Sequence, residues 1–120
     1  MRIGEVASMS GMPASTLRYY ERIGLIDVPR SSSSGHRDYS EDIFRQLDII
    51  KMAQRNGFSL AEIHTLLHSD EVFSQVWRRI ARQKILEIEQ RIARYESMRD
   101  SLQIGLVCDC ISLETCHLIV

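Results

Sequence analysis

The sequence predicts a mainly α-helical protein, in which a small N-terminal unit of short helices precedes one long helix that needs a partner. Three observations support this fold class. Apolar residues recur at helical spacing in four segments before residue 70, glycines and a serine tract separate these segments, and residues 74–104 contain neither proline nor glycine. A chain of 120 residues is short for two independent cores, so a partner subunit is expected to complete the fold.

The first two segments predict short helices joined by a turn. Val6 belongs to the apolar face of the first, and Gly11 ends that helix. Pro13 suits the first turn of the second helix, where its missing N–H costs no hydrogen bond. Leu17 and Tyr20 give this second helix an inward face. Two short helices with a glycine in the turn between them are typical of a helix-turn-helix.

A loop and two more helices follow. Residues 31–35 are four serines and a glycine, a polar tract that cannot bury surface and therefore predicts a loop, interpreted as a wing. Helical spacing over residues 41–56 predicts a third helix that ends before Gly57. Ser59 and Glu62 have the spacing of a capping box, which predicts a fourth helix ending near Asp70.

The segment from 74 to 104 predicts a helix of roughly 31 residues, or about 46 Å at 1.5 Å per residue. Such a helix is too long to be buried on so small a domain. Its apolar positions are spaced by fours and threes, with one polar exception at Arg99; they are Ala81, Ile85, Ile88, Ile92, Tyr95 and Leu102. This heptad seam predicts a coiled coil in a homodimer, whereas the alternative is a helix that packs on its own domain alone.

The overall charge does not indicate a nucleic-acid binder. The formal net charge is -1 and the sequence pI is about 6.4, so any contact with DNA depends on where the cations are placed. No apolar run approaches the roughly 20 residues of a membrane span, and Met1 leads into the first helix without a signal-peptide pattern. We therefore expect a cytoplasmic protein with no membrane partner.

The outward face of the second predicted helix suits a DNA groove. It combines short hydroxyls, cations and a phenol, carried by Ser15, Thr16, Arg18, Tyr19 and Arg22. Hydroxyls and arginines bind phosphates, and arginine also reads guanine edges. Any one of these residues taken singly is more often part of a solvated helix surface than a DNA contact. Arg37 and Tyr39 add another cation and phenol after the serine tract.

Four stretches of the chain read IGEVA at 3–7, TLRYYE at 16–21, GLI at 24–26 and GHRDY at 35–39. Together they closely resemble the winged helix-turn-helix of the MerR family of transcription regulators, and the resemblance continues through 49–63 and the long helix. It implies a winged helix-turn-helix DNA-binding domain at 1–70, a dimerisation helix forming an antiparallel coiled coil at 71–104, and an effector-sensing loop at 105–120.

The same resemblance implies a role for these residues and a mechanism. Arg18 and Tyr19 would lie on the recognition helix, Arg37 and Tyr39 on the wing would hold phosphates, and Arg55 is a further candidate. The dimer would bind a pseudo-palindrome in double-stranded promoter DNA, because a twofold protein matches a twofold operator. On activation it would bend and untwist the promoter for RNA polymerase, and sequence-dependent DNA deformability would contribute to specificity.

The C-terminal segment holds three cysteines within nine residues, Cys108, Cys110 and Cys116. Thiolates are soft ligands that favour copper(I), zinc, mercury or iron–sulfur clusters, and Asp109 or His117 could add another ligand. The loop from Cys108 to Cys116 is similar to that of the family's copper-efflux regulators. Ser74 stands where the family's divalent-metal sensors carry a cysteine. The resemblance therefore implies a thiophilic, copper(I)-like ion.

The cysteine spacing leaves other interpretations open. It is also similar to that of the family's SoxR-type redox sensors, except that Gly105 occupies the position of their first cluster ligand. An iron–sulfur cluster would then need another ligand. The thiols could instead be incidental or form a regulatory disulfide. A small metalloenzyme is the alternative from another class, but Glu114 on a short loop is a poor general base, so we expect no enzyme.

Overall fold

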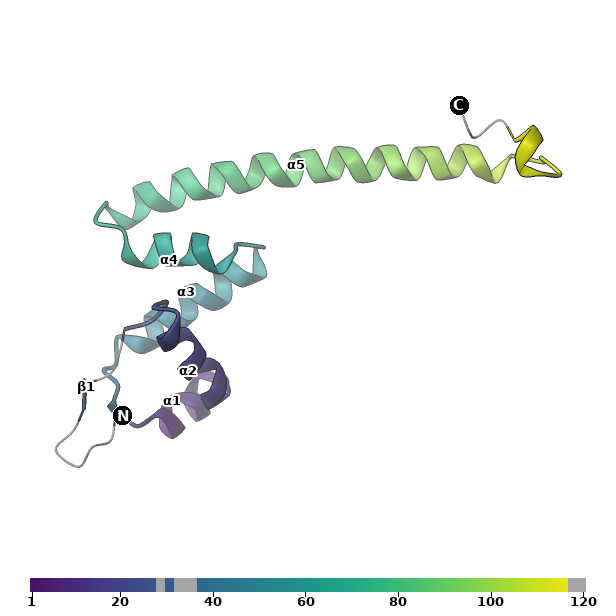
Figure 1. Ribbon diagram of the computed structural model, residues 1–120. Coiled ribbons are helices and arrows are strands. Elements are labelled where there is room, and N and C mark those ends of the chain that lie inside the picture. The colour runs from purple at the N-terminus through teal and green to yellow at the C-terminus, as the bar shows by residue number, and fades with distance from the viewer. Residues whose placement is uncertain (28–29, 32–36, 117–120) are drawn as a thin grey trace. The chain divides into compact units, whose positions relative to one another are not determined.

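The computed structural model describes residues 1–27, 30–31 and 37–116, with no side-chain description at 30, 31 and 37. Its elements are α1 (Ile3–Ser10), α2 (Ala14–Arg22), β1 (Arg30–Ser31), β2 (Arg37–Asp38), α3 (Ile43–Arg55), α4 (Leu60–His68), α5 (Phe73–Leu106) and the short 3-10 helix η1 (Leu113–Thr115) (Figure 1). The mainly helical fold class is therefore confirmed. None of the helices in the described ranges is long and apolar enough to cross a membrane.

The chain divides into two compact units, Met1–Ile80 and the part that begins at Ala81. The first unit holds the apolar core, in which α1, α2, α3 and α4 each contribute a fully buried side chain: Val6, Leu17, Ile50 and Ile63. Val76 of α5 is also buried, so the first turns of the long helix belong to this unit.

The turn between α1 and α2 is closed by local hydrogen bonds. Gly11 has a φ of +74°, a left-handed conformation that L side chains rarely adopt, and it ends α1. The Ser10 hydroxyl accepts the N–H of Met12 at 3.2 Å, and the Lys51 ammonium of α3 donates to the Ser10 carbonyl. Pro13 is the N-cap of α2 and lies one residue outside the helix. This turn sets the angle between α2 and α1.

Strands β1 and β2 pair antiparallel, with Arg30 opposite Asp38 and Ser31 opposite Arg37. These strands flank the segment that was predicted to be a loop and interpreted as a wing. Most of the serine tract falls within residues 32–36, which lie outside the described residues.

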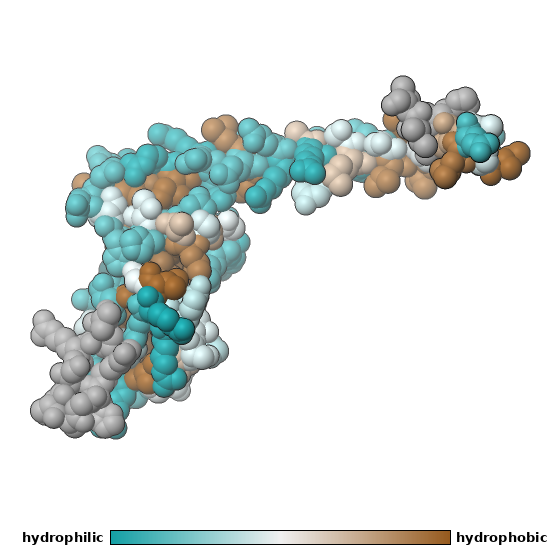
Figure 2. Space-filling view, in the orientation of Figure 1, coloured by the Kyte–Doolittle hydropathy of each residue, from teal (hydrophilic) through white to brown (hydrophobic). Residues whose placement is uncertain are grey.

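The second unit consists of the remainder of α5 and the cysteine segment. Most of its apolar side chains are exposed, including Ile85, Ile88, Ile92 and Tyr95. Brown apolar patches are visible along part of α5 and near its C-terminal end (Figure 2). Because burial of apolar surface stabilises a fold, these exposed apolar side chains of α5 are a candidate contact surface.

The N-terminus of α4 offers a direct test of the predicted capping box. The Ser59 hydroxyl accepts a hydrogen bond from the N–H of Glu62 at 3.2 Å, and the Glu62 carboxylate accepts one from the N–H of Ser59 at 2.9 Å.

We expect Ser59→Ala to lower the free energy of unfolding by about 1 kcal/mol, measured by urea denaturation. Thr65→Ala, on the exposed face of the same helix, is the control. A loss for Ser59→Ala no larger than that of the control would contradict the role of the cap.

Candidate nucleic-acid interface and metal centre

Helix α2 has polar side chains on its exposed face and apolar side chains on its buried face, as expected for the predicted recognition helix. Ser15, Arg18, Tyr19 and Arg22 are exposed and Thr16 is half-buried. On the opposite face, Leu17 and Tyr20 are buried in the core of the first unit. The helical period produces this division, since residues three or four apart lie on the same face. All five predicted contact residues of α2 therefore keep some accessible surface.

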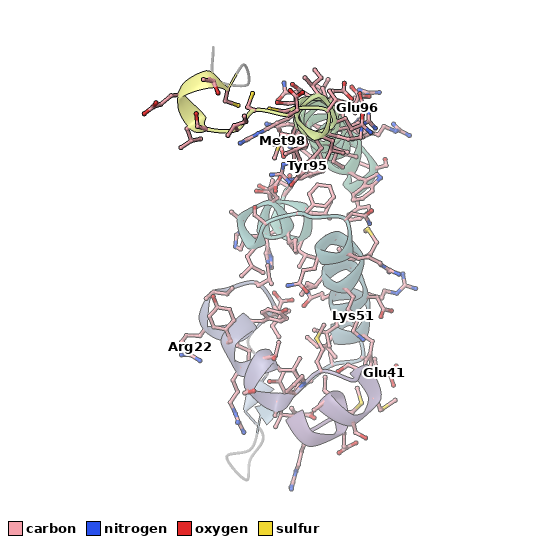
Figure 3. The ribbon with its side chains drawn as sticks, turned by 90° about the vertical axis from the view of Figure 1, so that its right-hand side faces the viewer. Arg22, Glu41, Lys51, Tyr95, Glu96 and Met98 are labelled. Carbon is pink, nitrogen blue, oxygen red and sulfur yellow. The ribbon has the colours of Figure 1, made fainter. Side chains whose placement is uncertain are left out.

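The guanidinium of Arg22 makes a cation–π contact with the ring of Tyr19. Its guanidinium carbon lies 5.8 Å from the centroid of the Tyr19 ring, and Arg22 projects away from the helices of the first unit (Figure 3). A cation–π contact at an exposed site is worth about 0.5–1 kcal/mol. This contact restricts both side chains, so less conformational entropy is lost when they bind a partner.

The structure corrects the expectation for Tyr39. Its side chain is only 4% exposed, and its hydroxyl donates a hydrogen bond to the Glu21 carboxylate, which is itself buried. The Tyr39 N–H also donates to the Met1 carbonyl at 2.7 Å. Tyr39 therefore belongs to the core of this structure, where its phenol is not presented to a phosphate. For Arg37, which lies in β2, the structure describes the backbone but not the side chain.

Glu21 is the residue that the sequence reasoning missed. A carboxylate this deeply buried needs a hydrogen-bond partner, and Tyr39 provides one across 18 positions of the chain. A local signal for its burial exists, because Glu21 lies four residues after Leu17 and so shares the inward face of α2. The bond joins α2 to the residue that directly follows β2.

We expect Tyr39 to influence DNA binding by positioning the wing rather than by contact. Tyr39→Phe and Glu21→Leu should each weaken promoter binding by up to about tenfold, and the double variant should be no weaker than the worse single variant. Fluorescence anisotropy with a promoter duplex measures this, with circular dichroism to confirm that each variant is folded. Additive losses would instead indicate that Tyr39 contacts DNA independently of Glu21.

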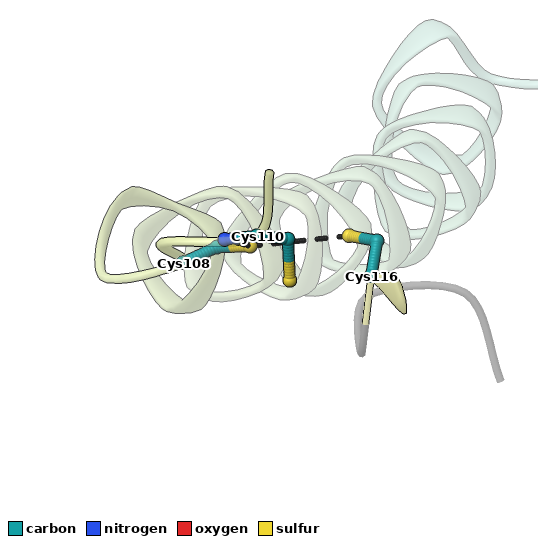
Figure 4. A group of neighbouring side chains, drawn as sticks. All are labelled: Cys108, Cys110 and Cys116. Atoms are coloured by element: carbon teal, nitrogen blue, oxygen red, sulfur yellow. Dashed lines mark hydrogen bonds between the residues drawn. The ribbon is translucent and has the colours of Figure 1, made fainter. Parts of the chain in front are cut away.

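The three cysteines converge at the C-terminal end of the described chain. The sulfur atoms of Cys108, Cys110 and Cys116 all lie within 4.8 Å of one another, and each residue is half-buried (Figure 4). The Sγ atoms of Cys108 and Cys116 are 3.9 Å apart, and none of the three cysteines forms a disulfide. The predicted clustering of the thiols is therefore present in the structure.

Local turns bring these thiols together. The N–H of Cys108 donates to the Gly105 carbonyl at 3.1 Å and closes the end of α5. The chain then reverses through η1, where the Thr115 hydroxyl donates to the Ser112 carbonyl at 3.3 Å and the Cys116 N–H donates to the Leu113 carbonyl, also at 3.3 Å. The reversal returns Cys116 to the sulfur of Cys108.

The environment of Cys108 favours its thiolate. A hydrogen bond from the Cys110 thiol, then one from the Cys110 N–H, and a weaker one from the Cys116 thiol lower the pKa of Cys108, and partial burial opposes this shift. The N–H of Cys110 lies 3.5 Å from the Cys108 sulfur. Since the thiolate is both the nucleophile and the metal ligand, Cys108 is prepared to bind a soft ion.

The distances between the sulfurs fit one thiophilic ion. Two thiolates at about 2.3 Å from an ion would be about 4.6 Å apart if arranged in line. The 3.9 Å between Cys108 and Cys116 is shorter, which corresponds to a bent arrangement with room for the Cys110 sulfur. Asp109 is exposed and does not belong to this group of ligand atoms, and His117 lies outside the described residues.

Two short helices joined by a turn, a pair of short strands and a long helix with exposed apolar side chains are typical of DNA-binding transcription regulators. Residues 1–70 match the family described as "MerR HTH family regulatory protein", and residues 44–104 match the one described as "MerR, DNA binding". The chain belongs to the MerR family of transcriptional regulators. Its members regulate transcription and are not enzymes, which confirms the expectation that this protein is no enzyme.

Three similar proteins illustrate the match. An HTH-type transcriptional regulator of Synechocystis sp. is 36% identical over 122 residues, covering 93% of this chain and 85% of the relative. The mercuric resistance operon regulatory protein of Bacillus cereus is 47% identical over 66 residues, covering 55% of this chain and 50% of that protein. The transcription regulator PbrR691 from Ralstonia metallidurans, crystallised with lead(II), has a similar fold, with a TM-score of 0.76, 24% identity and coverage of 98% of this chain and 95% of that one.

Proposed function

We propose that this protein is a homodimeric transcription regulator that responds to a thiophilic metal ion bound by its C-terminal cysteines and activates a promoter by distorting it. One observation carries the proposal: the sulfurs of Cys108, Cys110 and Cys116 lie within 4.8 Å of one another. Soft thiolates select soft ions, and a copper(I)-like ion is the one that the sequence resemblance favours. The match to a regulator of mercuric resistance supports a thiophilic effector.

The exposed face of α2 supports the DNA-binding part of the proposal. Arg18 and Arg22 would bind phosphates or guanine edges, with Ser15, Thr16 and Tyr19 as neutral contacts and Arg37 on the wing. Each cation that neutralises a phosphate releases counterions, so the affinity for promoter DNA should fall steeply as salt rises. RNA polymerase would then use the distorted promoter.

The alternative effector is an iron–sulfur cluster in a redox sensor of the same family. A two-iron cluster needs four protein ligands, and each of its two irons binds two of them. Three sulfurs this close together suit a single ion better, since a cluster distributes its ligands over two irons. Cluster binding would therefore require Asp109, His117 or an external thiol and a rearrangement of the loop.

Anaerobic purification followed by an absorption spectrum and elemental analysis tests the choice of effector. We expect a colourless protein that contains, or takes up, about one thiophilic ion per chain, because copper(I) and zinc thiolates lack the visible bands of iron–sulfur clusters. A brown protein with iron and sulfide would favour the redox sensor. A protein that neither contains nor binds metal at micromolar concentration would overturn the metal proposal.

The uncovered seam of α5 supports dimerisation. Ile88, Ile92, Tyr95 and Leu102 are between 41% and 71% exposed, and Tyr95 and Met98 lie on the same side of the helix (Figure 3). We expect Ile92→Asp to convert the dimer to a monomer, because each chain would then bury an unpaired carboxylate in an apolar seam. Sedimentation velocity measures the mass, and Gln90→Asp, on the opposite face of α5, is the matched control. A dimer retained by Ile92→Asp would exclude this seam as the interface.

A further inference from the structure

Helix α4 carries two histidines one turn apart. His64 and His68 are four residues apart, so the helical period places them on the same face of the helix. Both residues are exposed, and their ring centroids are 4.6 Å apart with an angle of 44° between the ring planes. They lie in the first unit, whereas the cysteine loop belongs to the second, and they are not among the predicted DNA contacts.

A hydrogen bond fixes the orientation of the His68 ring. Its Nε2 lies 2.8 Å from the backbone carbonyl oxygen of Leu25, in the segment that follows α2. Histidines that bind a metal through one ring nitrogen usually have a carbonyl or carboxylate oxygen on the other, because that bond orients the ring. The bond to Leu25 gives His68 this arrangement, with Nδ1 as the nitrogen that would bind an ion.

We propose that His64 and His68 form a binding site for a divalent transition-metal ion. Imidazole suits nickel(II), copper(II) and zinc(II), whereas thiolates select softer ions. Two histidines four residues apart on one helix face are the spacing with which a helix contributes two ligands to one divalent ion. Among the described residues, only the three cysteines form a group of three or more such ligands, so water would complete the coordination at the histidine pair.

The separation of the two rings suits a chelate. Nitrogen ligands lie about 2.0–2.1 Å from such an ion, so the two nitrogens must come within about 4.2 Å of each other. Ring centroids 4.6 Å apart permit this when the exposed His64 ring turns a nitrogen toward Nδ1 of His68. The second imidazole then binds within the same molecule, which raises the affinity above that of a single surface histidine.

An ion at this pair would stabilise the end of α4. His68 is the last residue of the helix, and helix ends fray. A bridge to His64, one turn earlier, would hold this last turn, and the bond to Leu25 connects it to the segment after α2. Because the unfolded chain does not hold the two rings together, ion binding should raise the temperature of thermal unfolding.

The test uses the full-length protein without a histidine tag, in which the three cysteines are replaced by serine so that thiols do not compete for the ion. Isothermal titration calorimetry with nickel(II) measures affinity and stoichiometry, and circular dichroism follows thermal unfolding. His64→Ala and His68→Ala each remove one proposed ligand. His36→Ala is the matched control, since it removes one imidazole that does not belong to α4.

We expect about one nickel(II) ion per chain, with an affinity at least about tenfold lower in His64→Ala and in His68→Ala and unchanged in His36→Ala. Nickel(II) should raise the unfolding temperature of the cysteine-free protein and of the control. It should not raise that of His64→Ala, which keeps the bond between His68 and Leu25.

Equal affinities in all the variants, a loss in only one of the two α4 variants, or no binding at millimolar nickel(II) would overturn the proposal. The thiols are absent from every protein in this experiment. Its result is therefore independent of the metal-sensing function proposed for the cysteine loop.

Discussion

Replacing Cys116 by serine is expected to abolish the response to the metal ion while promoter binding in its absence remains unchanged. Cys116 supplies one of the two sulfurs that lie 3.9 Å apart, so its loss leaves Cys108 without this partner sulfur. Cys108→Ser should have the same result. Loss of a thiolate ligand should lower the affinity for the ion by about 100-fold or more. A promoter–reporter assay over a range of metal concentrations measures the response, and anisotropy measures DNA binding.

Glu114→Gln is the matched control for these cysteine variants. Glu114 lies in η1, within the same loop, and is exposed, so its substitution changes a polar side chain without removing a sulfur. It should keep the metal response. A full response in Cys116→Ser would exclude the sulfur pair as the sensing site, and loss of promoter binding by that variant would show that the loop is needed for DNA binding even without metal.

Replacing Arg18 by alanine is expected to weaken promoter binding by about 10- to 100-fold, which corresponds to roughly 1–3 kcal/mol for an arginine that contacts a base edge or phosphate. Arg18 is exposed on α2, next in sequence to the fully buried Leu17, so the substitution should not disturb the core. The slope of the logarithm of affinity against the logarithm of salt concentration should decrease by about one if a phosphate contact is lost.

Arg79→Ala controls for the loss of one positive charge. Arg79 is exposed on α5 and pairs with Glu71 at 2.7 Å, and it is not among the predicted DNA contacts. Its loss should change neither the affinity for the promoter nor the salt slope beyond experimental error. Equal affinity losses for Arg18→Ala and Arg79→Ala would show that only net charge matters, and undiminished affinity in Arg18→Ala would exclude the predicted face of α2.

Local sequence patterns accounted for the helices and most of their bounds. The predicted third helix at 41–56 is observed as Ile43–Arg55, and the long helix predicted at 74–104 is observed as Phe73–Leu106. The long helix continues through Gly105, because a single glycine near the end of a helix costs only about 1 kcal/mol. Hydrophobic period, capping residues and helix breakers act over a few positions, which is why the sequence reveals them.

The sequence by itself determined the fold class, the family, the exposed face of α2 and the clustering of the cysteines. Only the tertiary structure decided the place of Tyr39. Tyr39 is buried and donates to the carboxylate of Glu21, which lies 18 residues earlier. This pairing depends on groups that the folded chain brings together, and residue spacing along the sequence does not encode it.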